Sequence, residues 1–274
     1  MKLDPFLDFN YLKKNYNKLS KPSGKLAIIT GGSGRIGSVF SSLFLMNGVN
    51  VLVISRSKEK FELFKKSLPK RIQKKIHWGY VDLSKPETVD HFWKNLKNKK
   101  VDYLVNNAAF HMRGKFIKYN KKELTDEFFG IIGSAILLTE KVLPFMRKNK
   151  KGKIINVGSI WGVNAPKFST YLEMDISPSL MTSVCKSGIM HMSKYLAARE
   201  SVYGITINNL SPGWFPRKGK KSRHDYMAMI NKDIPLKRIG KLEDLVSVVN
   251  FLISSGSNYF TGQTIKVDGG HSIW

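Results

Sequence analysis

Near its N-terminus the chain runs Leu26-Ala27-Ile28-Ile29-Thr30-Gly31-Gly32-Ser33-Gly34-Arg35-Ile36-Gly37. An apolar β-rich run, a glycine-rich turn and the start of an amphipathic pattern follow one another here. Gly31 permits a tight turn, Gly34 lets backbone N–H groups approach a pyrophosphate, and Gly37 lets a helix pack close to the strand. The helix N-terminus then faces the phosphates. A plain glycine-containing loop is the alternative. The stretch predicts a dinucleotide site with contacts from Thr30, Gly31, Ser33, Gly34, Arg35, Ile36 and Gly37.

Apolar, β-rich runs alternate with amphipathic runs along the rest of the chain. The runs expected as strands are Leu26–Thr30, Val51–Ile54, Ile76–Tyr80, Val101–Val105, Ile154–Val157, Ile205–Asn208 and Thr264–Val267. The main runs expected as helices are Ile36–Met46, Glu87–Leu96, Leu124–Arg147 and Val184–Arg199. Because this alternation requires right-handed crossovers, it predicts an α/β fold: a doubly wound parallel sheet of about seven strands with helices on both faces.

The pattern contains no internal repeat and no linker-like break. We therefore expect one domain over residues 25–274, preceded by an N-terminal extension of residues 1–24. The extension lacks a continuous apolar stretch, so it does not read as a secretory signal; a surface-packed segment is expected, with a partner-binding arm as the alternative. The stretch Pro212–Pro235 is irregular and charged, and it predicts an active-site lid at about residues 213–235.

Composition limits the classes of function. The 274 residues carry a formal net charge of +26, and nine of the 46 basic residues are arginine. The lysines are spread widely without a nucleic-acid-binding signature, so we expect only weak, non-specific attraction to polyanions. No run approaches the ~20 apolar residues of a membrane span. The single Cys185 excludes an intrachain disulfide, which fits a cytoplasmic protein. His111, His191 and His224 show no metal-ligand spacing, so no metal site is expected.

The end of the second predicted strand bears on the type of cofactor. An acid at this position usually binds the ribose hydroxyls of NAD, but the chain has Ser55 there, followed by Arg56. A serine and an arginine suit a 2′-phosphate, and Arg35 could add a second cation, so NADP(H) is favoured over NAD(H). Plain surface arginines are the alternative.

Two further strand ends carry cofactor candidates. Asp82 and Leu83 follow the third strand, where the carboxylate could accept a hydrogen bond from the adenine amino group. Asn106-Asn107-Ala108-Ala109 follow the fourth strand. Small residues at Asn107 and Ala108 leave room for a cofactor, and Asn106 is expected to brace the central strands by side-chain hydrogen bonds. A simple turn is the alternative for each.

The ordered set of motifs resembles the short-chain dehydrogenase/reductase family over about residues 24–271. It comprises Thr30–Gly37, Asp82, Asn106–Ala109, Ser159, Lys186, Ser211-Pro212-Gly213 and the tail Thr261-Gly262-Gln263 to Val267-Asp268-Gly269-Gly270. The resemblance implies a Rossmann-like domain with Pro212 and Gly213 at the cofactor. The segment from Gly158 to Met181 is also similar to a bacterial subgroup linked to flagellin modification and legionaminic-type sugar synthesis.

Family chemistry implies hydride transfer between the nicotinamide and a carbonyl or alcohol carbon. The resemblance assigns Ser159 to the substrate oxygen, where its hydroxyl would stabilise developing charge. It assigns Lys186 to the nicotinamide ribose hydroxyls, with a positive charge that lowers the pKa of a nearby acid. Both residues are therefore catalytic candidates.

Three positions depart from the family pattern. Thr182 stands four before Lys186, where the family has its proton-handling tyrosine. Ile131 replaces the asparagine that bends a helix and anchors a relay water, and Arg217 replaces a threonine that holds the carboxamide. An aliphatic hydroxyl is far less acidic than a phenol of pKa ~10, and it is too short to reach as far.

These departures leave three hypotheses open. The first is an active oxidoreductase with a displaced acid, for which Tyr171 is the first candidate and Tyr226 the second; Tyr171 as a packing aromatic is the alternative. The second is an impaired, cofactor-binding pseudoenzyme with a regulatory or subunit role. The third is a non-redox sugar reaction. Cys185, next to Lys186, is expected to be a small buried packing residue rather than a nucleophile.

The lid and the long helices suggest partners. The lid carries Arg217, Lys218, Lys220, Lys221, Arg223 and His224. Cations above a cleft suit an anionic or sugar-like small-molecule substrate, and a solvated loop is the alternative. Relatives dimerise or form tetramers through the helices that correspond to Leu124–Arg147 and Val184–Arg199, so the resemblance implies a homodimer or homotetramer.

Overall fold

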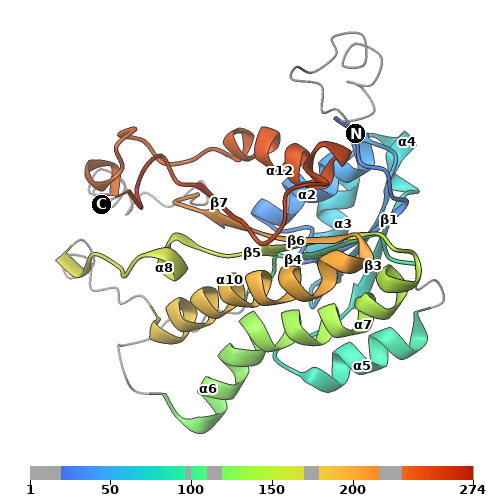
Figure 1. Cartoon of the computed structure of the whole chain (residues 1–274), viewed down its shortest axis with the longest axis horizontal. Coiled ribbons are helices and arrows are strands. Elements are labelled where there is room, and N and C mark those ends of the chain that lie inside the picture. The colour runs from blue at the N-terminus through green and yellow to red at the C-terminus, as the bar shows by residue number, and fades with distance from the viewer. Residues whose placement is uncertain (1–19, 97–99, 110–118, 170–178, 216–229, 274) are drawn as a thin grey trace, which may run out of the picture.

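The structure is a computed structural model that describes residues 20–96, 100–109, 119–169, 179–215 and 230–273. Its centre is a seven-stranded sheet in the order β3-β2-β1-β4-β5-β6-β7 (Figure 1). The strands are β1 (Leu26–Thr30), β2 (Asn50–Ser55), β3 (Ile76–Tyr80), β4 (Tyr103–Asn106), β5 (Gly152–Val157), β6 (Ile205–Pro212) and β7 (Thr264–Val267). Every pair is parallel, and all seven strands overlap the runs expected from the sequence, which confirms the predicted fold class.

The strand order reverses at β1. This strand pairs with β2 on one side, with Ile28 opposite Leu52, and with β4 on the other, with Ile28 opposite Leu104. A crevice opens where successive connections leave a parallel sheet in opposite directions, at the carboxyl ends of its strands. The glycine-rich turn after β1 and the turn after β4 therefore border the same crevice.

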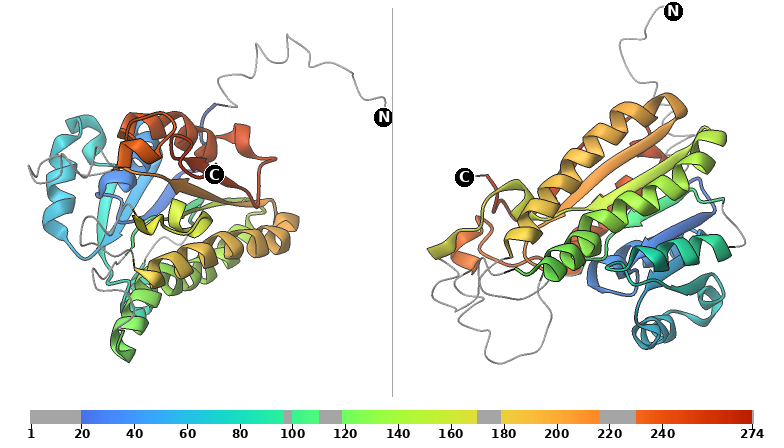
Figure 2. Two further views of the ribbon diagram at one scale, coloured as in Figure 1. Left: turned by 90° about the vertical axis from the view of Figure 1, so that its left-hand side faces the viewer. Right: turned by 90° about the horizontal axis from the view of Figure 1, so that it is seen from below.

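Helices cover both faces of the sheet (Figures 1 and 2). One face carries α2 (Arg35–Met46), α3 (Lys58–Ser67) and α12 (Val246–Ile253); the other carries α5 (Pro86–Asn95), α7 (Ser134–Lys148) and α10 (Leu180–Glu200). Shorter elements are α4 (Lys70–Gln73), α6 (Lys121–Phe128), the π-helix η1 (Phe129–Gly133), α8 (Ile160–Val163), η2 (Ser201–Tyr203), η4 (Leu242–Leu245) and η5 (Ser255–Ser257). The right-hand view of Figure 2 shows α5, α7 and α10 as neighbours.

Each face of the sheet has its own hydrophobic core, because the buried side chains of the parallel strands alternate between the two faces. Phe40 and Phe44 of α2 pack with Val249 of α12 against one face. Leu138 and Met146 of α7 pack against the other. The two cores hold the strands from both sides, so the turns at the carboxyl edge start from fixed positions.

The stretch from Lys121 to Lys148 corrects the expectation about long apolar runs. Over these 28 residues α6, η1 and α7 form one continuous helical stretch with a mean hydropathy of 1.6 in its most apolar window, which is long and apolar enough to cross a membrane by composition. Half of that window is buried inside the protein, and Leu138, Val142 and Met146 are part of the core. This burial is that of a core helix.

The stretch Pro212–Pro235, expected to be irregular, has regular structure near both ends, whereas the lid expected at about residues 213–235 stays a prediction. Pro212 is the last residue of β6 rather than part of an irregular segment, because it pairs with Val267 and needs no N–H donor at a strand end. Residues 230–233 are helical. The lid cations from Arg217 to His224 lie outside the described residues.

Candidate active site

The glycine-rich turn has the geometry of a phosphate cradle. Gly31 adopts a φ of 62°, a left-handed conformation that glycine takes without strain. A Cβ on Gly37 would lie 2.2 Å from the Gly31 carbonyl oxygen, so only glycine lets α2 start this close to β1. Gly34 caps α2 without a side-chain hydrogen bond, which leaves the first-turn N–H groups for a ligand. These features fit a dinucleotide pyrophosphate.

Side chains after β4 fix this turn in place. The Thr30 hydroxyl accepts hydrogen bonds from the N–H groups of Asn107 and Ala108, both at 2.8 Å. The Asn107 amide donates to the carbonyl oxygens of Thr30 and Gly31 at 2.8 and 3.3 Å. The structure thus brings together the glycine turn and the two small residues that were predicted from separate parts of the sequence.

The ends of β2 and β3 hold the other cofactor candidates. Ser55 is half-buried, and its hydroxyl accepts a hydrogen bond from the Trp78 indole at 3.1 Å. Arg56 is exposed at the next position. After β3, one oxygen of Asp82 accepts from the backbone and hydroxyl of Ser84 at 3.2 and 2.8 Å, which orients the carboxylate. Leu83 is half-buried beside it.

Asn106 braces the central strands, as expected. Its amide donates to the side-chain oxygen of Asn156 on β5 at 2.8 Å, and the Asn156 amide donates to Ser193 of α10 at 2.9 Å. This buried chain of side chains ties β4, β5 and α10 together. It fixes α10, the helix that carries Lys186, relative to the carboxyl edge of the sheet.

Ser159 follows β5 and caps α8. Its hydroxyl oxygen accepts a hydrogen bond from the N–H of Trp161 at 3.2 Å, which leaves the hydroxyl hydrogen to donate to another group. Gly162 of α8 packs against α10 so closely that a Cβ would lie 2.6 Å from the backbone carbon of Lys186. The missing side chain at Gly162 therefore brings Ser159 toward α10.

Lys186 is buried, and its ammonium donates to the carbonyl oxygen of Val157 at 2.6 Å. Val157 lies two residues before Ser159, so the structure places the two predicted catalytic residues at the same end of β5. Burial lowers the pKa of Lys186 from 10.5 to about 8, because the charged form loses its hydration. The group still carries its proton for most of the time at neutral pH.

Thr182 has a partner that the sequence reasoning missed. Its hydroxyl donates to one oxygen of Glu127 at 2.7 Å, and the Ser179 hydroxyl donates to the same oxygen at 2.6 Å. The Tyr119 hydroxyl lies 2.9 Å from that of Ser179 and extends the chain. Glu127 is fully buried on α6, and its second oxygen has no hydrogen-bond partner among the described residues. The Thr182 hydroxyl thus points to a carboxylate on α6.

A sequence signal for Glu127 existed. It is an acid four residues before Ile131 in the predicted helix Leu124–Arg147, and this spacing puts the two side chains on one helix face. An acid on a buried face requires polar partners, but the spacing does not say which residues supply them.

Ile131 lies within the π-helix η1 and packs with Cys185 and Ile189 of α10 in a small apolar cluster. The position that the resemblance assigns to a water-anchoring asparagine is therefore occupied by an apolar side chain packed among apolar neighbours. Cys185 is buried, as expected for a packing residue, and burial raises the pKa of its thiol to about 11. Such a thiol is a poor nucleophile at neutral pH.

At the end of β6, Pro212 and Gly213 continue the carboxyl edge, and the Gly213 N–H donates to the carbonyl oxygen of Val267 at 2.9 Å. Trp214 meets Trp161 of α8 edge to face, with ring centroids 5.8 Å apart. Tyr171, Tyr226, Arg217 and His111 lie outside the described residues, so their roles stay predictions. Over the described part of the chain, no group of three or more His, Cys, Asp or Glu could hold a metal ion.

The fold and this edge of the sheet define a nucleotide-binding α/β protein, and comparisons with known proteins narrow the class. A family model described as Enoyl-(Acyl carrier protein) reductase matches residues 33–272. The chain is 30% identical over 250 residues to a 3-oxoacyl-(acyl-carrier-protein) reductase of Chlamydia trachomatis serovar D, which covers 90% of this chain and 96% of the relative. It is 27% identical over 257 residues to post-translational flagellin modification protein A of Campylobacter coli, which covers 91% and 98%.

A solved structure gives the same result. A short chain dehydrogenase from Leptospira borgpetersenii with bound NAD+ matches with a TM-score of 0.79 and 27% identity, and the match covers 99% of each chain. The chain therefore belongs to the short-chain dehydrogenase/reductase family.

Proposed function

We propose that this protein is an NADP(H)-dependent oxidoreductase that interconverts a carbonyl and an alcohol through a rebuilt proton-handling site. The observation that carries the proposal is the placement of Ser159 and Lys186 at one end of β5, beside a glycine turn with phosphate-binding geometry. A bound nicotinamide would supply or accept the hydride. The Ser159 hydroxyl would donate to the substrate oxygen, and the Lys186 ammonium would hold the ribose. Residues 25–274 act as one domain in this proposal.

Thr182 does not supply the acid in this mechanism. Its hydroxyl donates to the buried carboxylate of Glu127, and a carboxylate partner opposes loss of the hydroxyl proton. The acid is instead Tyr171, with Tyr226 as the second candidate. Both belong to segments that adjoin the carboxyl edge in sequence.

A pseudoenzyme is the second candidate function, and two observations favour it. The hydroxyl of Thr182 is held by Glu127, and Ile131 fills the relay-water position with an apolar side chain. In this case the protein binds the cofactor but turns over slowly or not at all, and it serves as a subunit or a regulator.

For the cofactor, NADP(H) is favoured because Arg56 is exposed at the end of β2 beside a serine rather than an acid. We expect Arg56→Ala to weaken NADPH binding about tenfold or more and to leave NADH binding nearly unchanged, because a charge-assisted hydrogen bond to the 2′-phosphate is lost. Fluorescence titration measures both, with Arg71→Ala as an exposed arginine control on α4. Equal losses for NADPH and NADH would contradict the assignment.

For the substrate, we propose a sugar-like or anionic carbonyl compound in the cytoplasm. The resemblance to a subgroup linked to flagellin modification and legionaminic-type sugar synthesis supports a sugar, and the chain has a flagellin modification protein among its relatives. The 3-oxoacyl reductase relatives support a 3-oxoacyl thioester as the other arm of the test. A panel of keto-sugars, nucleotide keto-sugars and 3-oxoacyl thioesters, followed by NADPH absorbance, separates these classes.

The central experiment compares the parent with Thr182→Tyr and Tyr171→Phe. Turnover in the parent that falls at least tenfold in Tyr171→Phe supports the displaced acid. Turnover that appears only in Thr182→Tyr supports the pseudoenzyme. A parent that turns over equally well with Tyr171→Phe and Tyr226→Phe contradicts the displaced acid, and a parent that does not bind NADPH contradicts both functions.

A further inference from the structure

A cavity lies at the edge of the sheet opposite to the candidate active site. A cavity of about 290 Å³ opens at the amino ends of β4, β5 and β6, whereas the glycine turn and Ser159 follow the carboxyl ends of their strands. Residues that line it include Tyr103, Lys151, Lys153, Thr206 and Asn258. None of them belongs to the cofactor or catalytic set, so the cavity is separate from the candidate active site.

Lys153, the second residue of β5, is the main feature of this cavity. The residue is 7% exposed, and its ammonium donates to the Ser257 hydroxyl at 3.0 Å. An ammonium has three N–H donors, and no acidic group forms an ion pair with this one in the described part of the chain. Burial and the neighbouring Lys151 both lower the pKa of Lys153, to about 8. Burying a cation without an anion costs free energy, so an anion bound beside Lys153 would stabilise the folded protein.

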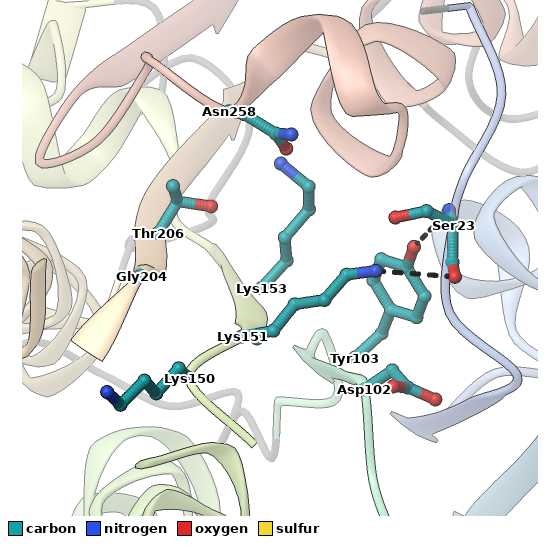
Figure 3. A pocket seen from close by; sticks show the side chains of 10 residues that line it. Ser23, Asp102, Tyr103, Lys150, Lys151, Lys153, Gly204, Thr206 and Asn258 are labelled. Carbon is teal, nitrogen blue, oxygen red and sulfur yellow. Dashed lines mark hydrogen bonds between the residues drawn. The ribbon is translucent and has the colours of Figure 1, made fainter. Parts of the chain in front are cut away.

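Lys151 adds a second cation on the same wall. Its ammonium reaches the carbonyl oxygen of Ser23 across the cavity at 3.5 Å. Figure 3 shows Lys153 extending toward Asn258 and Lys151 toward Ser23, with Thr206 and Tyr103 on either side, while Lys150 extends away from the group. Two ammonium groups therefore border one concave space.

The acid of the cavity wall does not neutralise these lysines. One oxygen of Asp102 accepts hydrogen bonds from the backbone N–H groups of Lys25 and Leu26, at 2.7 and 3.0 Å. These contacts attach the start of β1 to β4. The carboxylate is thus held at the side of the cavity, and the cavity keeps a net positive charge.

We propose that this cavity binds a small phosphate-type anion between Lys151 and Lys153, with the Thr206 hydroxyl and the Asn258 amide as further donors. A doubly charged oxyanion removes the repulsion between the two ammonium groups. It also supplies the acceptors that the buried Lys153 lacks. The site is independent of the cofactor, and its occupant is a free phosphate or diphosphate, or the phosphate group of a small metabolite.

The test is calorimetric titration of the whole chain with sodium pyrophosphate at pH 7 and constant chloride concentration. We compare the parent with Lys151→Met, Lys153→Met and the matched control Lys150→Met, which removes the same charge from a lining residue whose side chain extends away from Lys151 and Lys153 (Figure 3). We expect binding at least tenfold weaker in the first two variants and unchanged in Lys150→Met. Titration with glucose 6-phosphate then distinguishes a phosphate ester from the free anion.

Each other outcome contradicts the proposal. Equal binding by all four proteins assigns pyrophosphate to the glycine turn or another site, because the lysine variants leave that turn intact. Equal weakening in all three variants would mean that pyrophosphate binds through the overall positive charge of the protein, as a polyanion such as RNA would. If the parent shows no binding at pyrophosphate concentrations of about 10 mM, the site is excluded. Circular dichroism checks the fold, and if Lys153→Met is unfolded, the pair Lys151→Met and Lys150→Met decides.

Discussion

The candidate active site contains a buried ammonium group, that of Lys186, whose burial costs free energy. Its ammonium is buried and donates to a backbone carbonyl, and no carboxylate of the described residues is bound to it. A buried charge of this kind lowers the stability of the folded protein, because the ammonium loses its hydration and a carbonyl dipole replaces only part of that interaction. A ligand hydroxyl or phosphate in the crevice would add to the stabilisation. The retention of the lysine therefore argues for cofactor binding in the folded protein.

We expect Lys186→Met to raise the free energy of unfolding by about 1–3 kcal/mol at pH 7, since each pKa unit corresponds to about 1.4 kcal/mol. The pKa is 10.5 in the unfolded chain and about 8 when folded. Below pH 8 the folded and the unfolded chain both hold this proton, so the full free-energy cost of burying the charged lysine is present. Between these values the unfolded chain binds more protons, so this group makes the parent more stable as pH rises.

Urea unfolding between pH 7 and 10.5 checks this prediction. The rise attributed to Lys186 should disappear in Lys186→Met and remain in Lys194→Met, a control at an exposed position of the same helix. The same slope in Lys186→Met and in the parent would mean that the lysine is not buried as a cation. NADPH titration of Lys186→Met should show weakened binding at the same time.

Thr182 and Glu127 form the second residue-scale prediction. We expect Thr182→Val to lower the free energy of unfolding by about 1–3 kcal/mol, because the buried carboxylate loses one of its two hydroxyl donors while the shape is kept. Thr182→Ser retains the donor and should stay within about 1 kcal/mol of the parent. Thermal and urea unfolding compare the three proteins. A Thr182→Val variant as stable as its parent would show that the hydroxyl does not serve Glu127.

The sequence predicted some of these residues and not others, for a physical reason. The glycine turn was predictable because it directly follows a predicted strand, and Ser159 and Lys186 were predictable because they match the motifs of the family that the chain resembles. The Glu127 partnership was not, because it joins α6 to α10 across 55 residues and depends on how two helices pack. The burial of Ile131 likewise became visible only with its neighbours Cys185 and Ile189 in place.

At the scale of elements, close backbone contacts position the site. Gly37 allows α2 to start against the Gly31 carbonyl, and Gly162 allows α8 to pack on α10. Both contacts exclude a side chain and so fix a helix end within a narrow range. The cofactor turn and the Ser159 turn are thus held by packing rather than by loop stiffness.

Gly37→Ala tests this view. A Cβ would lie 2.2 Å from the Gly31 oxygen, a backbone atom that cannot rotate away, so the glycine turn must shift. We expect NADPH binding to weaken at least tenfold and stability to fall by about 1–3 kcal/mol. Gly188→Ala is the matched helix control, because its Cβ meets the end of the flexible Ile132 side chain. Fluorescence titration and urea unfolding measure both, and equal effects in the two variants would contradict the argument.

The π-helix marks the limit of prediction at this scale. Hydrophobic periodicity predicted one helix over Leu124–Arg147, and the structure has α6, η1 and α7 in that range. A helical pattern with a period of 3.6 residues does not reveal one wider turn. At Gly133 within it, a Cβ would lie 2.5 Å from the ring of Phe129, so this glycine fits the turn better than any other residue.

At the scale of the whole molecule, the sheet separates the proposed cofactor site from the proposed anion site. The carboxyl edge carries the glycine turn, Ser159 and Lys186, and the amino edge carries the lysine cavity. The strands between them are buried on both faces, so a ligand at one edge does not contact a ligand at the other. The two sites should therefore bind independently, each contributing its own increment to stability.

Exposed apolar side chains gather on the outer helices of one face of the sheet. Leu180, Val184 and Tyr195 are exposed on α10, and at 100° per residue they fall on one stripe of that helix. Ile136 of α7 is exposed at 43%. Apolar groups gathered on adjacent helices favour burial against a second copy, as the family resemblance implies.

We expect the parent to have a light-scattering mass of at least twice the 31.1 kDa of one chain. The double variant Ile136→Lys/Val184→Lys should return to the mass of one chain, because two buried ammonium groups facing their own symmetry copies cannot be paired in a two-fold interface. Leu63→Lys, at an exposed apolar position of α3 on the other face, controls for the added charge. A dimer that survives the double variant, or one that dissociates equally in Leu63→Lys, would place the interface elsewhere. Because α10 carries both Val184 and Lys186, dissociation that also weakens NADPH binding would show that the interface supports the site.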